Sequence, residues 1–112
     1  MTFDKVRELG LALPDVTEGT AFGKRALKVG GQMFACEPSH KSAEPDSLAI
    51  RIDNDQRDAL LAEAPETYYL TDHYVGYPSV LVRLAHIRAD EMRDLLRAAH
   101  KFVTTRKPRK RS

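Results

Sequence analysis

The string His73-Tyr74-Val75-Gly76-Tyr77-Pro78, with Arg83 shortly after it, holds the side chains best suited to binding. It combines aromatic rings, a titratable imidazole and a turn-forming glycine and proline, and it leads into an apolar run. Loops on a rigid scaffold commonly carry binding side chains, so this segment could bind a nucleic-acid base, a peptide or a small anion. The structural alternative is that the tyrosines pack half-buried under the edge of a sheet and Pro78 fixes the turn.

Covalent and metal chemistry find little support in the sequence. Ser79 lacks the flanking glycines of a nucleophile elbow, and Cys36 lies in a predicted strand, where a lone cysteine is usually a small core residue. Cys36, Glu37 and His40 are close together, but a closed zinc site needs four ligands and the other histidines are scattered. There is no phosphate loop or dinucleotide fingerprint. We therefore expect no catalytic residue, no metal and no cofactor.

The positive charge of the chain is concentrated at its C-terminus. Five of the 18 Lys and Arg residues lie in the tail, so residues 1–105 carry 13 basic and 16 acidic side chains and a net charge of −3. The tail cations are Arg106, Lys107, Arg109, Lys110 and Arg111. They would attract any polyanion through counterion release, without sequence selectivity. The alternative is that residues 104–112 are a disordered, solubilising end.

Two groups of basic residues in the body could add phosphate contacts. One group surrounds a predicted hairpin and comprises Lys24, Arg25 and Lys28. The other follows one face of the last helix and comprises Arg93, Arg97, His100 and Lys101. Edge-strand charges also prevent sheet-to-sheet aggregation, and Asp90 and Asp94 are spaced to pair with the helix arginines. Either reading leaves these residues as candidates for nucleic-acid binding.

The length and the termini indicate one soluble domain. A chain of 112 residues has room for a single core. With one cysteine there is no internal disulfide, which fits a reducing compartment. The N-terminus lacks the apolar segment of a signal peptide, and no run approaches a membrane span. We expect a cytoplasmic protein with one domain over residues 1–103 and a basic tail over residues 104–112.

Hydrophobic periodicity predicts the order α-β-β-β-α-β-β-α. The expected helices cover about residues 3–13, 53–64 and 90–103, and the expected strands cover residues 25–29, 32–36, 48–52, 67–71 and 80–85. Residues 15–24 are polar and are expected to form a loop, while Gly30-Gly31 predicts a hairpin turn. Short connections favour antiparallel pairing. The predicted fold is α+β, a two-layer α/β sandwich with a five-stranded antiparallel sheet and three helices on one face.

Several strings in this order resemble the MmcQ/YjbR-like family across residues 3–103. They are Leu13-Pro14-Asp15-Val16 with Glu18, Phe22-Gly23, Leu27-Lys28-Val29-Gly30-Gly31, Met33-Phe34-Ala35, the His73 to Pro78 string, Val80-Leu81-Val82-Arg83-Leu84 and the Leu-Leu of the last helix. The resemblance implies a secretion-chaperone-like architecture and DNA binding through hairpin wings. Family members often have aromatic residues where this chain has Ser79 and His100, so the resemblance implies no aromatic stacking at Ser79 or His100.

These observations favour a non-enzymatic binding module, with nucleic acid as the first partner to test. The alternatives are a protein-binding, chaperone-like adaptor and a small-ligand domain with a pocket lined by Phe22, Tyr74 and Tyr77. A continuous positive surface from Lys24 to Lys101 would favour nucleic acid. Exposed apolar residues on the free sheet face would favour a protein partner. A deep concavity between the loops would favour a small ligand.

Overall fold

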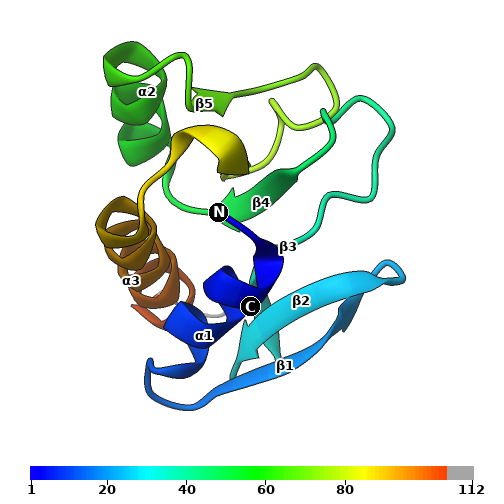
Figure 1. The fold of residues 1–112 in the computed structure, drawn as a ribbon, viewed down its shortest axis with the longest axis vertical. Coiled ribbons are helices and arrows are strands. Elements are labelled where there is room, and N and C mark those ends of the chain that lie inside the picture. The colour runs from blue at the N-terminus through cyan, green and yellow to red at the C-terminus, as the bar shows by residue number, and fades with distance from the viewer. Residues whose placement is uncertain (106–112) are drawn as a thin grey trace, which may run out of the picture.

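The computed structural model describes residues 1–105, and it contains three α-helices and six strands (Figure 1). In chain order they are α1 (Phe3–Leu11), β1 (Val16–Ala21), β2 (Lys24–Val29), β3 (Gln32–Cys36), β4 (Ser47–Arg51), α2 (Asn54–Glu63), β5 (Tyr68–Tyr69), β6 (Ser79–Arg83), a 3-10 turn (Leu84–His86) and α3 (Ala89–Thr105). The predicted α+β class with three helices is confirmed. The five cations of the predicted tail lie outside the described residues.

The strands form one open antiparallel sheet in the order β1-β2-β3-β4-β6-β5. The prediction of five strands was wrong because the segment expected to be a loop contains β1, which pairs with β2 from Val16↔Val29 to Ala21↔Lys24. This edge strand is half exposed and carries Gly19, so apolar alternation did not reveal it. Its backbone ladder with β2 holds it in place instead of buried side chains.

The helices pack on one face of the sheet and enclose the main core (Figure 1). The largest fully buried side chains there include Phe34, Leu27, Leu48, Ile50, Ile52, Met92 and Leu96. Thr2 caps α1 by accepting a hydrogen bond from Lys5 N, and Asp53 caps α2 by accepting one from Gln56 N. Asp90 lies in the first turn of α3 and does not cap it. That helix starts at Ala89, and Glu91 accepts a hydrogen bond from Arg88 N just before it.

The other face of the sheet carries small side chains and is crossed by two loops. Its buried cluster comprises Ala26, Cys36, Ala49 and Leu81. The loops span residues 37–46 and 70–78 and lie side by side at the upper right of Figure 1. Hydrogen bonds join them, such as Ser42 Oγ to Thr71 Oγ1 at 2.8 Å and Glu44 N to Tyr69 Oη at 2.8 Å. The loops thus form a second, thinner layer opposite the helices.

Two tight hairpins connect the first three strands. Phe22-Gly23 links β1 to β2 with φ of 55° and 76°, and Gly30-Gly31 links β2 to β3 with φ of 58° and 79°. Positive φ at both central residues defines the type I′ turn, which suits glycine or asparagine. The turn predicted at Gly30-Gly31 is confirmed. None of the helices in residues 1–105 is long and apolar enough to cross a bilayer.

A candidate binding pocket

A cavity of about 530 Å³ opens on the sheet face that the helices leave uncovered. Its floor comes from three neighbouring strands, its walls come from the two loops, and the tip of the first hairpin closes one side. The lining residues are Phe22, Met33, Ser39, His40, Ala49, Arg51, His73, Tyr77, Pro78 and Ser79. A mostly apolar hollow of this size with a few convergent polar groups has the usual form of a small-ligand site.

The polar part of the floor is made by Arg51 of β4 and Ser79 of β6. These residues are direct partners across the antiparallel ladder, so their side chains project from the same face of the sheet. Arg51 Nη1 donates to Met33 O at 3.2 Å. Ser79 is only 7% exposed, and its Oγ has no hydrogen-bond partner among the described residues. Buried hydroxyls nearly always have a partner, so this oxygen marks a place that a bound group could satisfy.

Two stacked histidines form part of the wall. The rings of His40 and His73 lie 3.8 Å apart between centroids and are nearly parallel, at 9°. His40 Nδ1 accepts a hydrogen bond from Ser42 N at 3.0 Å, which places the proton of the neutral ring on Nε2. Partial desolvation, followed by repulsion from His73 and Lys41, lowers the pKa of His40. The stack therefore favours an uncharged His40 at neutral pH.

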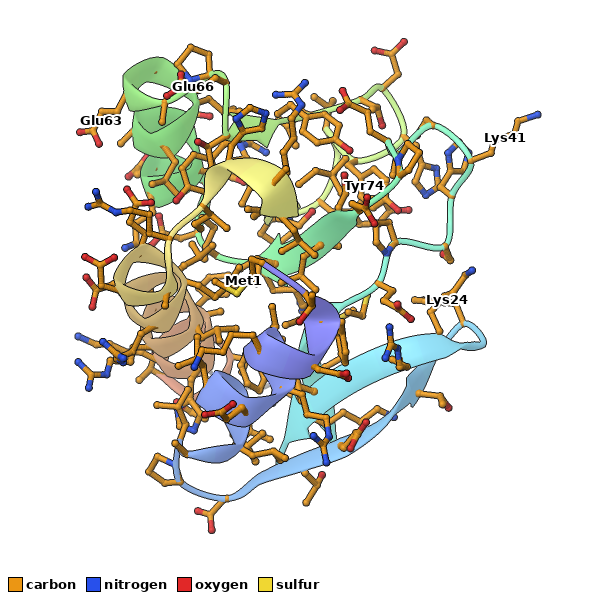
Figure 2. The ribbon with its side chains drawn as sticks, in the orientation of Figure 1. Met1, Lys24, Lys41, Glu63, Glu66 and Tyr74 are labelled. Atoms are coloured by element: carbon orange, nitrogen blue, oxygen red, sulfur yellow. The ribbon has the colours of Figure 1, made fainter. Side chains whose placement is uncertain are left out.

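Tyr74 supports this wall from behind and does not line the cavity. Its ring meets those of His73 and His40 edge-on, with centroid distances of 4.9 and 6.4 Å. Its hydroxyl accepts a hydrogen bond from His40 N at 3.4 Å, and desolvation raises its pKa. Figure 2 shows it pointing between the two loops. Tyr74 thus positions the histidines, whereas the sequence had suggested that it contacts a ligand.

The rim of the cavity is aromatic and exposed. Phe22 is 80% exposed and Tyr77 is 56% exposed. Phe22 has a φ of 55°, a left-handed conformation that is a genuine outlier for a bulky side chain. The equivalent turn between β2 and β3 uses glycine at this position. The fold therefore does not require phenylalanine there, and strain of this kind is typical of functional positions.

Arg83, which the sequence grouped with this loop, has a structural role instead. It makes two hydrogen bonds of 2.8 Å with Glu44 and donates to Pro65 O and Glu66 O at 3.1 and 3.2 Å. Its guanidinium lies 4.4 Å from the centre of the Tyr69 ring. These contacts tie the loop of residues 37–46 and the connection between α2 and β5 to the end of the sheet. Arg83 lies outside the cavity lining.

Within residues 1–105, the predicted basic residues do not gather on one surface. Arg25 is paired with Glu37 at 2.7 Å and Asp4 at 3.6 Å, and Lys28 is half-buried. Lys24 is exposed at the first hairpin on the right of Figure 2, whereas α3 lies on the left of Figure 1. A continuous positive face from Lys24 to Lys101 is therefore absent from residues 1–105.

The cations on α3 form a separate group. Arg93, Arg97 and Lys101 are exposed and make no ion pair within the described part of the chain. Asp90 pairs with Arg88 at 3.6 Å, so its expected pairing with Arg93 is not seen. His100 leaves this stripe, because its Nε2 lies 2.8 Å from Pro14 O and its ring packs on Phe34.

Cys36 is buried, and desolvation raises the pKa of its thiol to about 11, so the thiolate needed for nucleophilic attack is scarce at neutral pH. Within residues 1–105, no group of three or more His, Cys, Asp or Glu side chains is arranged to hold a metal ion. The sequence did not identify Arg51 or Met33 as site residues, and it considered Ser79 only as a nucleophile and as the place of an aromatic residue in related proteins. Strand alternation could have identified Arg51, since Leu48 and Ile50 fill the opposite face.

Comparisons with known proteins give a family and a fold. The family model described as YjbR matches residues 11–102. The uncharacterized proteins Rv2570 and MT2646 of Mycobacterium tuberculosis are each 34% identical to this chain, over 88% of it and 84% of the relative. The crystal structure of Deinococcus radiodurans protein DR2400, described as a DUF419 domain, superposes with a TM-score of 0.76 and 24% identity. It covers 94% of this chain and 80% of that one.

Proposed function

The chain belongs to the YjbR family, and we propose that it is a non-enzymatic binding module that holds a small ligand in the cavity between the loops. The observation that carries this proposal is the cavity itself, an apolar hollow whose floor contains an enclosed hydroxyl without a partner among the described residues. A ligand with an apolar body and one polar group would fill the hollow and satisfy Ser79 Oγ.

The exposed aromatic side chains at the rim also support the proposal that the cavity binds a ligand. Phe22 buries little surface in the fold and occupies a strained conformation, so it contributes little to stability where it stands. An aromatic ring at the mouth of an apolar cavity gains its contact area only when a partner covers it. The low thiolate content of Cys36 and the structural role of Arg83 support binding without covalent chemistry.

We would test the proposal with full-length ¹⁵N-labelled protein and a set of aromatic fragments carrying charges of −1, 0 or +1. We expect at least one fragment to shift the backbone signals of the floor strands and of both loops. Tyr77→Ser should weaken its binding several-fold. Val75→Ser is the matched control, because Val75 is in the same loop and equally exposed at 57% but does not line the cavity. If no fragment binds, or if the two variants weaken binding equally, the proposal fails.

A second candidate function is nucleic-acid binding through α3. It is favoured by Arg93, Arg97 and Lys101, which are spaced four residues apart on one exposed face and have no partner there among the described residues. The basic tail alone can give a slope of log affinity against log salt of about −4.5 at most. If α3 takes part, full-length protein should show a steeper slope on duplex DNA. Changing the three cations to glutamine should then reduce it by up to about 2.7. An unchanged slope would confine any such binding to the tail.

A further inference from the structure

Resting on this proposed function, we propose that the cavity selects a small aromatic carboxylate. Its carboxylate would lie against Arg51 and Ser79 on the floor, and its ring would lie between the aromatic side chains of the rim. The charges in the lining, the geometry of the floor and the composition of the rim all favour such a ligand.

The charge of the lining favours an anion. Residues 1–105 carry more acids than bases, yet the described residues that line the cavity include one arginine and no carboxylate. Glu37, at the start of one wall loop, is held by Arg25 through hydrogen bonds to both of its carboxylate oxygens. Two further cations, Lys24 and Lys41, extend from the same side of the molecule in Figure 2. An anionic ligand would therefore meet attractive charge along its path.

The floor suits a carboxylate in particular. Arg51 and Ser79 are cross-strand partners, so a guanidinium and a hydroxyl stand next to each other on one face. A guanidinium matches the planar geometry of a carboxylate, and hydrogen bonds from a charged donor to a charged acceptor are about twice as strong as neutral ones. The hydroxyl of Ser79, which is enclosed and paired with no group of the described chain, becomes a second donor when its side chain turns toward the cavity. A dianionic phosphate would find only one arginine among the described residues of this lining.

The upper part of the cavity suits an aromatic ring. Phe22 and Tyr77 come from different segments of the chain, and the ring of His73 contacts both Tyr77 and the stacked His40. The rings of His73 and Tyr77 are 6.0 Å apart and tilted by 46°. Such surfaces attract a further ring by edge or offset contacts. Met33 and Ala49 supply an apolar base beneath it.

The test uses full-length protein and three isosteres, namely 1-naphthoate, naphthalene-1-carboxamide and 1-naphthylmethylammonium, titrated at pH 7.5 by calorimetry. We expect the carboxylate to bind about tenfold more tightly than the amide, and the ammonium not to bind. Ser79→Ala should lower the affinity for naphthoate several-fold without loss of stability, because its hydroxyl has no partner in the described fold. Arg51→Gln should abolish the preference for the carboxylate, while Arg97→Gln on α3 should preserve it.

The outcomes separate this inference from the proposed function. Equal binding of carboxylate and amide in the cavity would overturn the inference and leave the small-ligand function intact. If none of the three compounds nor any fragment binds, both fall. Tighter binding of 1-naphthyl phosphate than of naphthoate would overturn the choice of carboxylate. If Arg51→Gln does not fold, Arg51→Lys is tested instead. Lysine keeps the positive charge but lacks the planar guanidinium, so this variant should lose most of the preference for the carboxylate over the amide.

Discussion

Replacing Phe22 with asparagine should separate the stability of the fold from the function of the cavity. Phe22 occupies the first central position of a type I′ turn with φ of 55°, and glycine follows it. Asn-Gly is among the most favourable pairs for this turn, because asparagine tolerates the left-handed region. The substitution keeps the hairpin geometry and removes the aromatic ring from the rim of the cavity.

The size of the effect follows from exposure and conformation. With 80% of Phe22 exposed, only a fifth of its surface is buried, which is worth at most about 1 kcal/mol at 25 cal/mol per Å². The left-handed conformation costs an ordinary side chain roughly 1–2 kcal/mol, and asparagine avoids much of that cost. We therefore expect Phe22→Asn to leave the free energy of unfolding unchanged or to raise it by up to about 1 kcal/mol. Its affinity for naphthoate should nevertheless fall several-fold.

Urea denaturation followed by circular dichroism measures the stability, and calorimetry measures the affinity. Phe22→Ala is the matched control, since it also removes the ring but lacks the side-chain amide that lets asparagine tolerate the left-handed region, and it should be less stable than Phe22→Asn. Phe34→Ala, in the main core, should cost about 3–5 kcal/mol and shows the scale of a structural phenylalanine. A loss of more than 1 kcal/mol in Phe22→Asn would show that Phe22 anchors the hairpin, and it would refute the argument from strain.

Three further predictions concern the fold around the site. Gly10→Ala should destabilise the protein by about 1–2 kcal/mol in urea melts, because its Cβ would overlap Leu27 Cδ1 in the core, whereas Gly76→Ala, with open space around it, should be neutral or stabilising. The arginine hydrogen bond that lowers the pKa of Glu37 stabilises the fold above the ordinary glutamate pKa. Stability should thus fall as the pH drops below about 4.3, and less so in Glu37→Gln. Cys36, with its pKa of about 11, should react slowly with a disulfide reagent at pH 8 until guanidinium unfolds the chain; rapid native reaction would contradict its burial.

The parts of the fold that the sequence predicted are those with strong apolar periodicity. The apolar periodicity of residues 90–103 predicted α3, and Met92, Leu96 and Val103 in this helix are fully buried. The Gly30-Gly31 hairpin was also clear, because its turn chemistry is local. Strand β1 was missed because Thr17, Glu18 and Thr20 give it a polar sequence and its order comes from pairing with β2. Edge strands depend on a neighbour that local sequence does not reveal.

The sequence predicted the residues that the loops contribute to the site, but it did not predict the residues that form the floor of the cavity. The sequence identified Phe22, His73 and Tyr77, and the structure brings all three to one cavity. It could not place Arg51 beside Ser79, because the two residues are 28 positions apart and become neighbours only through the β4–β6 pairing. The role of His40 was hidden for the same reason, since its stacking partner His73 lies in the other loop. Residues that are close together in the chain can be recognised from the sequence alone. Residues that meet across a sheet cannot, because their contact depends on the register of the strands.

The two faces of the sheet differ in a way that explains why the cavity lies where it does. The helix side is filled by large side chains such as Phe34 and Met92, while the buried cluster on the loop side has two alanines, Cys36 and Leu81. Small side chains under crossing loops leave space that this chain does not fill. A strained ring at the rim and an enclosed hydroxyl on the floor are two independent costs to stability, and both occur at this one cavity. Such departures from local rules are expected where function opposes stability, so their convergence argues for a ligand site more strongly than the volume alone.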